Sequence, residues 1–412
     1  MDYYAIAVIL IVLAAVFGYI NARFLKLPNT IGLMIISILF SVVLMGIGIV
    51  DNNFLEWEIK IIEQIDFKTL LMEGMLSFLL FAGALHIDFN QLKSQAIPII
   101  VFATIGILIS TFLVGGASYY ILQAIGLPTK FIYCLLFGAL ISPTDPIAVL
   151  GILKKAGVPA QLEAKIAGES LFNDGIGVVI FITIYEIAKS GGGDIHAAEI
   201  GRLFLEEVGG GLLLGFGLGF ICHYLMKSID NYEVEILITL AAVMGGYFLA
   251  MKLHFSGPLA MVVVGLMIGH DRFRTSSMSE MTEKYIDQFW KLLDVLLNAI
   301  LFVLIGLEIV ILTLNQQYII AGLIMIPVVL LSRFTALTLP IKLMERRLEL
   351  IPGTNIIMTW GGLRGGISIA LALSLTADMP RELILTMTYI VVIFSIIVQG
   401  LTMEGVVKKV LA

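Results

Sequence analysis

Long apolar runs recur from Tyr3 almost to the C-terminus, and this feature constrains the fold more than any other. A helix that crosses the ~30 Å hydrocarbon core of a membrane needs about 20 apolar residues. Thirteen segments are candidates on this measure: residues 3–22, 29–50, 67–86, 96–124, 131–153, 162–189, 202–227, 233–251, 256–270, 287–310, 317–343, 354–375 and 382–406. The ninth is short, so twelve spans are the alternative if it inserts only partly. The sequence therefore predicts an all-α polytopic membrane protein with about 13 transmembrane helices.

The composition excludes most water-soluble classes of protein. Of the 412 residues, 59% are hydrophobic and only 14% are charged, and the mean hydropathy is +1.03. A water-soluble domain carries about a quarter charged residues, because its surface faces water. Soluble enzymes, nucleic-acid binders and secreted disulfide scaffolds are therefore excluded. The apolar composition also predicts that membrane lipid surrounds the protein. The five histidines lack the spacing of a metal site, so we expect no cofactor.

The distribution of basic residues predicts the orientation. Loops after odd-numbered spans, together with the C-terminal tail, carry fifteen Lys and Arg residues, and the other loops carry seven. The positive-inside rule then places the N-terminus outside and the C-terminus in the cytoplasm. The acidic segment 51–66 is expected to be an outside loop. No soluble regulatory domain is expected, because the longest polar stretch, 270–287, is an ordinary connection. No nucleotide is expected, because no P-loop motif occurs, so the energy for any transport would come from a gradient.

Charged side chains inside the spans are costly to bury, so each is a functional candidate. These residues are Glu73, Asp145, Glu169, Asp174, Lys291, Asp294, Glu308, Arg333 and Arg364. Those in spans five, six and twelve lie in the most polar surroundings, and they carry the functional interpretation.

The fifth span is interrupted by the sequence Ser-Pro-Thr-Asp-Pro at residues 142–146. Each proline removes a backbone donor, so two prolines three residues apart should unwind the helix. Unwound backbone at membrane depth is tolerated only where it is buried or lines a watery cavity. Its carbonyls and the Thr144 hydroxyl suit a dehydrated monovalent cation, and Asp145 can neutralise the N-terminus of the following half-helix. A plain proline kink is the alternative.

The sixth span places polar side chains on one helix face. Ser170 and Asp174 are four residues apart and therefore stack, with Glu169 and Asn173 beside them. Carboxylate, hydroxyl and amide oxygens are ligands for a hard cation. A carboxylate removed from water also holds a proton more readily, so Asp174 can trade a proton for a cation. A purely structural role for both carboxylates is the alternative.

The twelfth span is interrupted by four glycines around Arg364, at residues 361–366. Two interrupted spans at corresponding places in two halves are a pointer to an inverted-repeat transporter with a site at the membrane midplane. The two buried arginines need carboxylates, and Glu169 is the obvious partner for one of them. In the alternative interpretation, such pairs only hold the helices together.

Four motifs resemble a known family: SPTDPIAVLGILKKAGVP (142–159), GESLFNDGIGVVIF (168–181), FAGALHIDF (81–89) and WGGLRGGISIALALSL (360–375). They are similar to the sodium/proton exchangers of the cation/proton antiporter superfamily, in its NhaP/NHE-type branch. The resemblance covers essentially the whole chain. It implies a secondary antiporter, not an enzyme, which exchanges Na⁺, Li⁺ or K⁺ for protons in pH and sodium homeostasis.

The resemblance also implies the architecture. It predicts a homodimer in the inner membrane of a prokaryote, in which spans five and twelve of each protomer cross where they unwind. A dimerisation domain would comprise residues of about 1–90 and 202–310. A core domain would comprise residues of about 96–189 and 317–406.

The family's site roles fall on residues of this sequence as follows. Asp174 is the carboxylate that alternately binds the cation and the proton, and Ser170 and the Thr144 backbone help to coordinate the transported Na⁺. Asp145 balances the half-helix dipoles. Asn173 stands where the electrogenic branch has a second Asp, which implies electroneutral one-for-one exchange.

Three further residues take supporting roles through the same resemblance. Glu169 would form an ion bridge with Arg333, and Arg364 would serve the broken twelfth span. Glu73 matches an acidic position that borders the cation path in some members.

Two rival classes use the same polar residues. An intramembrane aspartyl protease could use Asp145 and Asp174 as a dyad, but its GxGD-type surroundings are replaced here by Asn-Asp-Gly. A cation channel with this polar lining would conduct ions without proton coupling.

Overall fold

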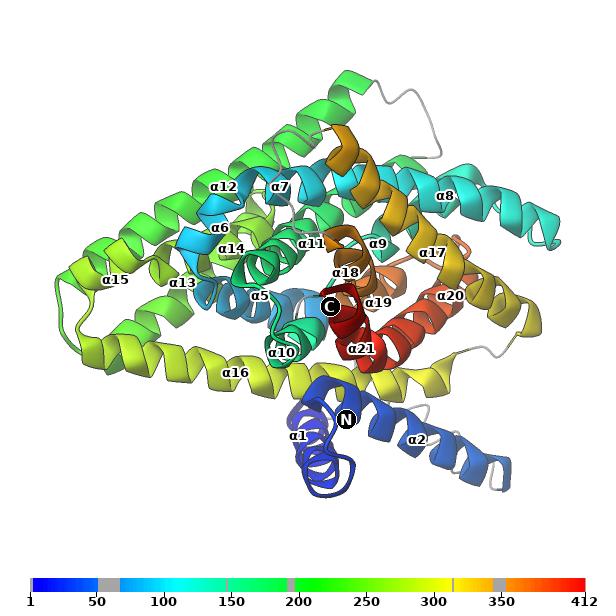
Figure 1. Cartoon of the computed structure of the whole chain (residues 1–412), viewed down its shortest axis with the longest axis horizontal. Helices are drawn as coiled ribbons and strands as arrows, with labels where there is room; N and C mark the ends of the chain where they lie inside the picture. The colour runs from blue at the N-terminus through cyan, green and yellow to red at the C-terminus, as the bar shows by residue number, and fades with distance from the viewer. Residues whose placement is uncertain are drawn as a thin grey trace.

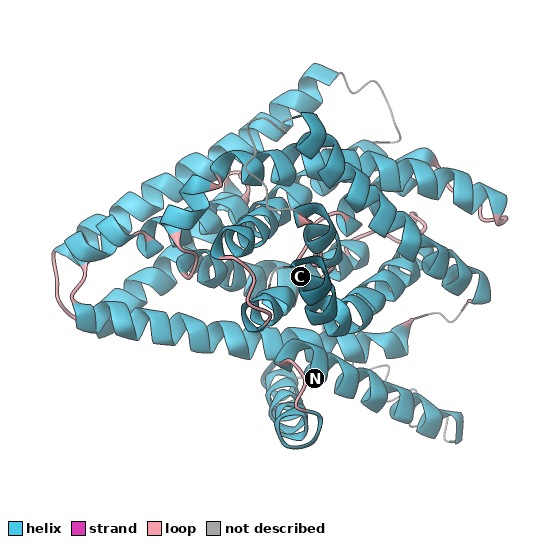
Figure 2. Cartoon of the chain, in the orientation of Figure 1, coloured by secondary structure: helices cyan, strands magenta, loops and turns pink. Residues whose placement is uncertain are grey.

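The computed structural model describes residues 3–50, 67–145, 147–190, 197–312, 315–343 and 353–411. Within these ranges every regular element is a helix (Figure 2). Ten of the described helices are long and apolar enough to cross a membrane, and two shorter apolar helices, Phe131–Ile141 and Gly257–Gly269, accompany them. The predicted all-α polytopic class is confirmed, whereas the number of membrane crossings stays a prediction.

The first half of the chain forms α1 (Tyr3–Ile20), α2 (Asn29–Val50), α4 (Phe67–Thr69), α5 (Leu76–Leu85), α6 (Phe89–Ser94), α7 (Ala96–Val101), α8 (Ile107–Ala124), α9 (Phe131–Ile141), α10 (Ile147–Lys155) and α11 (Ala160–Lys189). The second half forms α12 (Ala197–Lys227), α13 (Tyr232–Lys252), α14 (Gly257–Gly269), α15 (Asp271–Ser277), α16 (Glu280–Leu307), α17 (Gln316–Leu343), α18 (Thr354–Trp360), α19 (Gly366–Leu373), α20 (Arg381–Phe394) and α21 (Gly400–Leu411).

Short π-helical turns extend several of these helices. Asn21–Leu25 continues α1, Leu70–Met75 joins α4 to α5, Phe102–Gly106 joins α7 to α8, and Ser395–Gln399 joins α20 to α21. Each such turn inserts one residue into the regular ladder and is frequent at functional sites. Each predicted span corresponds to one helix or to a run of joined helices, except that spans five and twelve each correspond to two half-helices. The acidic segment 51–66 and Pro146 lie outside the described residues.

Helix starts follow from local capping. The side chain of Asn231 accepts hydrogen bonds from the backbone N–H groups of Glu233 and Val234 at the start of α13. Ser256 caps α14, which has a proline in its first turn, and Ser279 caps α16. Such caps satisfy backbone donors that have no partner within the helix.

The helices pack in two groups around the interrupted spans (Figure 1). α5, α12, α13 and α14 pack against one another, and α16 joins them along one side. On the other side α8, α9, α11, α17 and α20 pack together, and α1 and α2 lie against α16 at the edge of the molecule. The half-helices α10, α18 and α19 lie between these groups near the centre of the view.

Glycines allow α14 to approach its neighbours closely. A Cβ at Gly265 would lie 2.6 Å from the backbone oxygen of Phe81 in α5, and one at Gly269 would lie 2.5 Å from that of Leu85. On the other side, a Cβ at Gly215 of α12 would lie 2.7 Å from the backbone oxygen of Ala260. Small residues at such spacing let helix backbones pack closely in lipid, where no hydrophobic force draws helices together.

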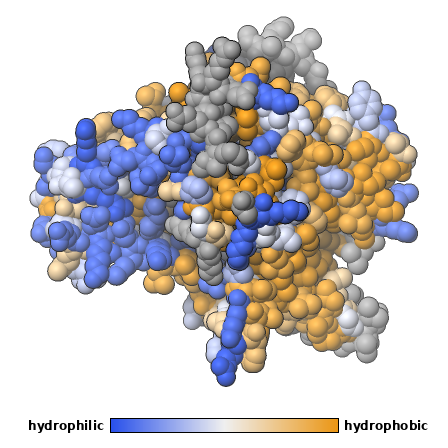
Figure 3. Space-filling view, in the orientation of Figure 1, coloured by the Kyte–Doolittle hydropathy of each residue, from blue (hydrophilic) through white to orange (hydrophobic). Residues whose placement is uncertain are grey.

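Hydrophilic residues gather at one end of the molecule. Figure 3 shows them at the left, where Figure 1 places α15 and the start of α16. Apolar side chains cover much of the remaining face, as expected for a surface in contact with lipid.

Candidate functional site

The first interruption separates α9, which ends at Ile141, from α10, which begins at Ile147. Its backbone is held by side chains of α11. The Thr144 N–H donates to Oδ1 of Asn173 at 3.2 Å, and the hydroxyls of Thr144 and Ser170 are 2.9 Å apart. Residues of α11 thus replace the hydrogen bonds that a continuous helix would have made, as buried backbone requires.

The second interruption separates α18, which ends at Trp360, from α19, which begins at Gly366. It lies directly against the first, because the Asp145 N–H donates to the Leu363 carbonyl at 2.8 Å. The glycines make this approach possible. A Cβ at Gly365 would collide with the carboxylate of Asp145, and one at Gly362 would collide with the side chain of Arg333.

Arg364 joins the two interruptions through its side chain. Its Nη1 donates to the carbonyls of Ser142 at 2.6 Å and Pro143 at 2.9 Å, and its backbone N–H donates to the Ser395 hydroxyl at 2.7 Å. The guanidinium is buried beside the last turn of α9, where a cation balances the negative end of the helix dipole. The sequence predicted that both buried arginines need carboxylates, but the Arg364 side chain donates to backbone carbonyls. Carbonyls freed by unwinding are buried without a hydrogen-bond partner and need a donor, whereas a carboxylate that is already paired does not.

A buried ion pair lies next to this crossing. Arg333 of α17 donates from Nη1 and Nη2 to the two carboxylate oxygens of Glu169, at 2.9 and 2.7 Å. Its Nε donates to the Met358 carbonyl at 3.2 Å. The two-pronged geometry is the strongest that Arg and a carboxylate form. The pair therefore ties α11 to α17 and α18.

Asn173 uses both ends of its amide within this network. Its Nδ2 donates to Thr144 Oγ1 at 2.9 Å and to Glu169 Oε1 at 3.1 Å, while its Oδ1 accepts from the Thr144 N–H. An aspartate here would have no donors for these two oxygens. Asn173 therefore positions the interrupted span rather than facing an open space.

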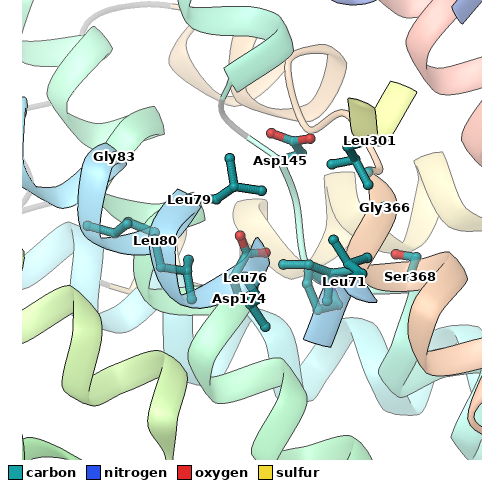
Figure 4. A pocket seen from close by; sticks show the side chains of 14 residues that line it. Leu71, Leu76, Leu79, Leu80, Gly83, Asp145, Asp174, Leu301, Gly366 and Ser368 are labelled. Atoms are coloured by element: carbon teal, nitrogen blue, oxygen red, sulfur yellow. The ribbon is translucent and has the colours of Figure 1, made fainter. Parts of the chain in front are cut away.

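Asp174 has a different environment. It is 6% exposed, and among the described residues its carboxylate has no hydrogen bond or ion pair. It lines a cavity of about 50 Å³ together with Asp145, Gly365, Gly366 and Ser368, and Leu71, Leu76, Leu79 and Leu80 cover the cavity (Figure 4). A single water requires only about 10–15 Å³ measured in this way, so a small ion fits. Unpaired buried carboxylates need a cation or a proton.

Only some of the predicted ligands line this cavity. Asp145 and Asp174 line it, whereas Ser170 and Thr144 do not, and their hydroxyls are bonded to each other. The ligand atoms that these residues offer are all oxygens, which hard cations prefer. A transported ion would be a substrate rather than a resident metal. Among the described residues no group of three or more His, Cys, Asp or Glu side chains could hold a metal.

Glu73 lies apart from the other predicted site residues. It is exposed in the π-helical turn Leu70–Met75, and it lines a separate cavity of about 560 Å³ with Tyr247 and Lys252. The Tyr247 hydroxyl donates to the Met72 carbonyl in the same turn. The structure thus brings together every predicted site residue except Glu73.

Two supporting residues were missed by the sequence reasoning. Ser395 accepts the Arg364 N–H, and Gln399 donates to the Trp360 carbonyl at 2.8 Å. Both belong to the π-helical turn Ser395–Gln399 and are buried. Polar residues four apart in an otherwise apolar span were the available signal.

Two crossed, broken helices around a buried, unpaired carboxylate define an ion transporter built from discontinuous spans. Comparison with known proteins makes the class specific. Residues 11–409 match the model of the family described as sodium/hydrogen exchanger, transmembrane, and the chain belongs to this family.

Individual relatives agree with this membership. The Na⁺/H⁺ antiporter NhaP of Pseudomonas aeruginosa is 47% identical over 98% of this chain and 96% of its own. The Na⁺/H⁺ antiporter NhaH of Halobacillus aidingensis is 36% identical over 94% and 93%. The structure of the sodium proton antiporter MjNhaP1 from Methanocaldococcus jannaschii matches with a TM-score of 0.75 at 20% identity, over 98% of this chain and 97% of that one, and shows the shared fold. The relatives are transporters, which excludes the intramembrane protease.

Proposed function

We propose that this protein is a secondary antiporter that exchanges Na⁺ or Li⁺ for protons across the membrane. One observation carries the proposal: the Asp174 carboxylate is buried, unpaired and open to a small cavity where two broken spans meet. Such a group binds either a proton or a cation, and it cannot hold both. Family membership and the printed names of the relatives support the same exchange.

The surrounding residues divide the work. Asp174 binds the ion or the proton, and Ser170 and the Thr144 backbone supply further oxygens beside it. Asp145 stands between the Leu363 carbonyl and the start of α10, where a negative charge offsets the positive helix end. The Glu169–Arg333 pair holds α11 in place while the occupant of Asp174 changes.

The stoichiometry follows from Asn173. Because its amide is engaged with Thr144 and Glu169 and carries no charge, Asp174 is left to exchange one proton for one monovalent cation. We therefore propose electroneutral exchange. Competition for one carboxylate also predicts an optimum in pH, since protons occupy Asp174 at low pH and no proton is available to carry at high pH.

We further propose that the protein works as a homodimer in the inner membrane, with its C-terminus in the cytoplasm. The residues of about 1–90 and 202–310 would form the stationary dimerisation domain, and those of about 96–189 and 317–406 the moving core. The separate packing of α5 with α12–α14 and of α9 with α8 and α11 supports this division. The excess of basic residues in alternate loops supports the orientation.

The test uses purified protein in liposomes that contain a pH-sensitive dye. Addition of Na⁺ or Li⁺ should change the internal pH, K⁺ is tested beside them, and clamping the membrane potential should leave the rate unchanged. Asp174→Asn should abolish the signal. Asp378→Asn, which alters an exposed aspartate, is the matched control and should retain it. Exchange that persists in Asp174→Asn would overturn the mechanism, and a rate that follows the potential would overturn the stoichiometry.

A further inference from the structure

A second cavity, of about 530 Å³, lies away from Asp174. It is lined by Phe172 of α11, Phe89 of α6, Phe216 and Phe220 of α12, and Met267 of α14. Its lining is almost entirely apolar. Phe216 and Phe220 are one helical turn apart and are 49% and 65% exposed, so their rings stand free along the same face. We call this cavity the phenylalanine groove.

The rim of the groove carries an unpaired cation. Arg272 in α15 lines the groove, is exposed and makes no ion pair among the described residues. The nearby charged side chains already have partners. Arg274 pairs with Glu283 and Asp287, and Asp271 accepts a hydrogen bond from Asn90 at 2.8 Å. Arg272 is therefore left to bind an anion from outside the chain.

A second polar atom lies in the wall of the groove. The ring of His223 packs edge-on against Phe273 with centroids 4.5 Å apart, and its Nδ1 is buried without a hydrogen-bond partner. His223 and Ser276 are the other polar side chains that line the groove with Arg272 and His270. All four belong to α15, to its N-cap or to the last turns of α12, so polarity is confined to one end of the groove.

This polarity gradient matches the membrane. α15 lies at the hydrophilic end of the molecule (Figures 1 and 3), whereas Phe172, Phe216 and Phe220 of the groove belong to α11 and α12. An amphiphile would place its charged group at α15 and its chain between α11 and α12. The Arg guanidinium binds phosphate through paired N–H donors.

We propose that the phenylalanine groove binds one anionic glycerophospholipid, with the phosphate on Arg272 and an acyl chain along Phe216 and Phe220. A concave groove takes a flexible chain, whereas an ordinary lipid-facing helix surface offers no such enclosure. The groove is separate from the ion site, because none of its lining residues belongs to the Asp174 cavity.

The experiment places a tryptophan in the groove and measures its quenching by lipids with brominated acyl chains. Phe220→Trp is the reporter. Phe112→Trp on α8 is the matched control, because Phe112 is similarly exposed, at 58%, and lines neither cavity. The full-length protein is titrated in detergent with brominated phosphatidylglycerol or phosphatidylcholine, and the unsubstituted protein supplies the background from its own tryptophans.

The reporter should prefer phosphatidylglycerol by about fivefold, the effect expected of one basic residue near an anionic headgroup, and the control should show no preference. Arg272→Gln should abolish the preference, and Arg272→Lys should retain part of it because the charge remains. Equal quenching by both lipids at both positions would mean ordinary solvation by lipid and would overturn the proposal. Absence of quenching at Phe220→Trp, with cross-linking between copies of the chain through this face, would identify a protein interface and would also overturn it.

Discussion

The two interrupted spans meet at the same point, yet they are broken by opposite means. In the first, Pro143 lacks a backbone donor, and its ring occupies the space that a side chain at Gly177 would need. In the second, Gly362 and Gly365 lack side chains, and Arg333 and Asp145 fill the space that is left. The first interruption therefore follows from the covalent structure of proline. The second leaves space that neighbouring side chains occupy.

This difference teaches which break depends more on its surroundings. A proline removes a backbone donor and crowds the preceding turn whatever surrounds it, although a helix can continue through proline, as α17 does at Pro327 and Pro340. Glycines permit many conformations and specify none, so the second break depends on Arg364, Ser395 and Gln399 to hold its backbone. Substitutions at the glycine break and its supports should therefore be more damaging than substitutions at the proline break.

The largest effect is expected from Arg364→Met. This change removes both donors from the carbonyls of Ser142 and Pro143 and leaves them buried without partners. We expect a loss of about 2–6 kcal/mol of stability, because each of the two buried carbonyls left without a donor costs about 1–3 kcal/mol. Cys134 and Cys222 are buried, so a thiol-reactive dye reports thermal unfolding. Arg23→Met, at an exposed arginine, is the control, and an equal shift in both variants would contradict the coupling of the two breaks.

Gly362→Ala should have the next largest effect. The new methyl group would collide with Arg333, which is held by Glu169 and cannot retreat without breaking a two-pronged ion pair. Overpacking of this kind costs about 1–3 kcal/mol, and exchange should fall with it. Gly116→Ala in α8 is the matched control, because nothing lies within 4 Å of its added methyl group. A Gly362→Ala protein as stable and active as Gly116→Ala would show that the space is not needed.

Pro143→Ala should be milder. The restored N–H does not rebuild the helix, because the N–H groups of Thr144 and Asp145 stay bonded to Asn173 and Leu363. The lost ring leaves a small gap against Gly177, at a cost of about 1 kcal/mol. Dye-based unfolding and proteoliposome exchange would be measured alongside Gly362→Ala. If Pro143→Ala were the more damaging of the two, the ranking of the breaks would be reversed.

The smallest effect is expected from Glu73→Gln. Glu73 is exposed and lines a different cavity from the one that contains both breaks. We expect an exchange rate within about twofold of the unsubstituted protein, as for other exposed positions away from a site. The rate should be compared at saturating and at low Na⁺. A loss of exchange that high Na⁺ restores would place Glu73 on the cation path after all.

Much of this arrangement could be predicted from the chain. Apolar length located the spans, since a membrane imposes one thickness on all of them. Paired prolines and clustered glycines located the breaks. Four-residue spacing stacks Glu169 and Asn173 on one face of α11, where their side chains are hydrogen-bonded.

The other contacts of the site join residues that lie far apart in the sequence, so no local sequence pattern predicts them. The partners of Arg364 lie more than 200 residues earlier in the chain, and a buried arginine is satisfied equally by a carboxylate or by carbonyls. Ser395 and Gln399 are four residues apart, but their partners, the Arg364 N–H and the Trp360 carbonyl, lie 31 and 39 residues earlier in the chain. The separation of Glu73 from Asp174 likewise reflects how α4 and α5 pack, and acidic residues in neighbouring spans do not reveal it.

The contact between the breaks also has a consequence for the order of events during synthesis. The donor at Asp145 leaves the ribosome long before its acceptor at Leu363, and Arg364 reaches back 222 residues to Ser142. The spans between the two breaks must therefore enter the bilayer while the carbonyls of residues 142 and 143 await their final partner. During translation these carbonyls depend on water, on lipid headgroups or on an insertion factor, and the exposed interval ends only when the glycine segment arrives.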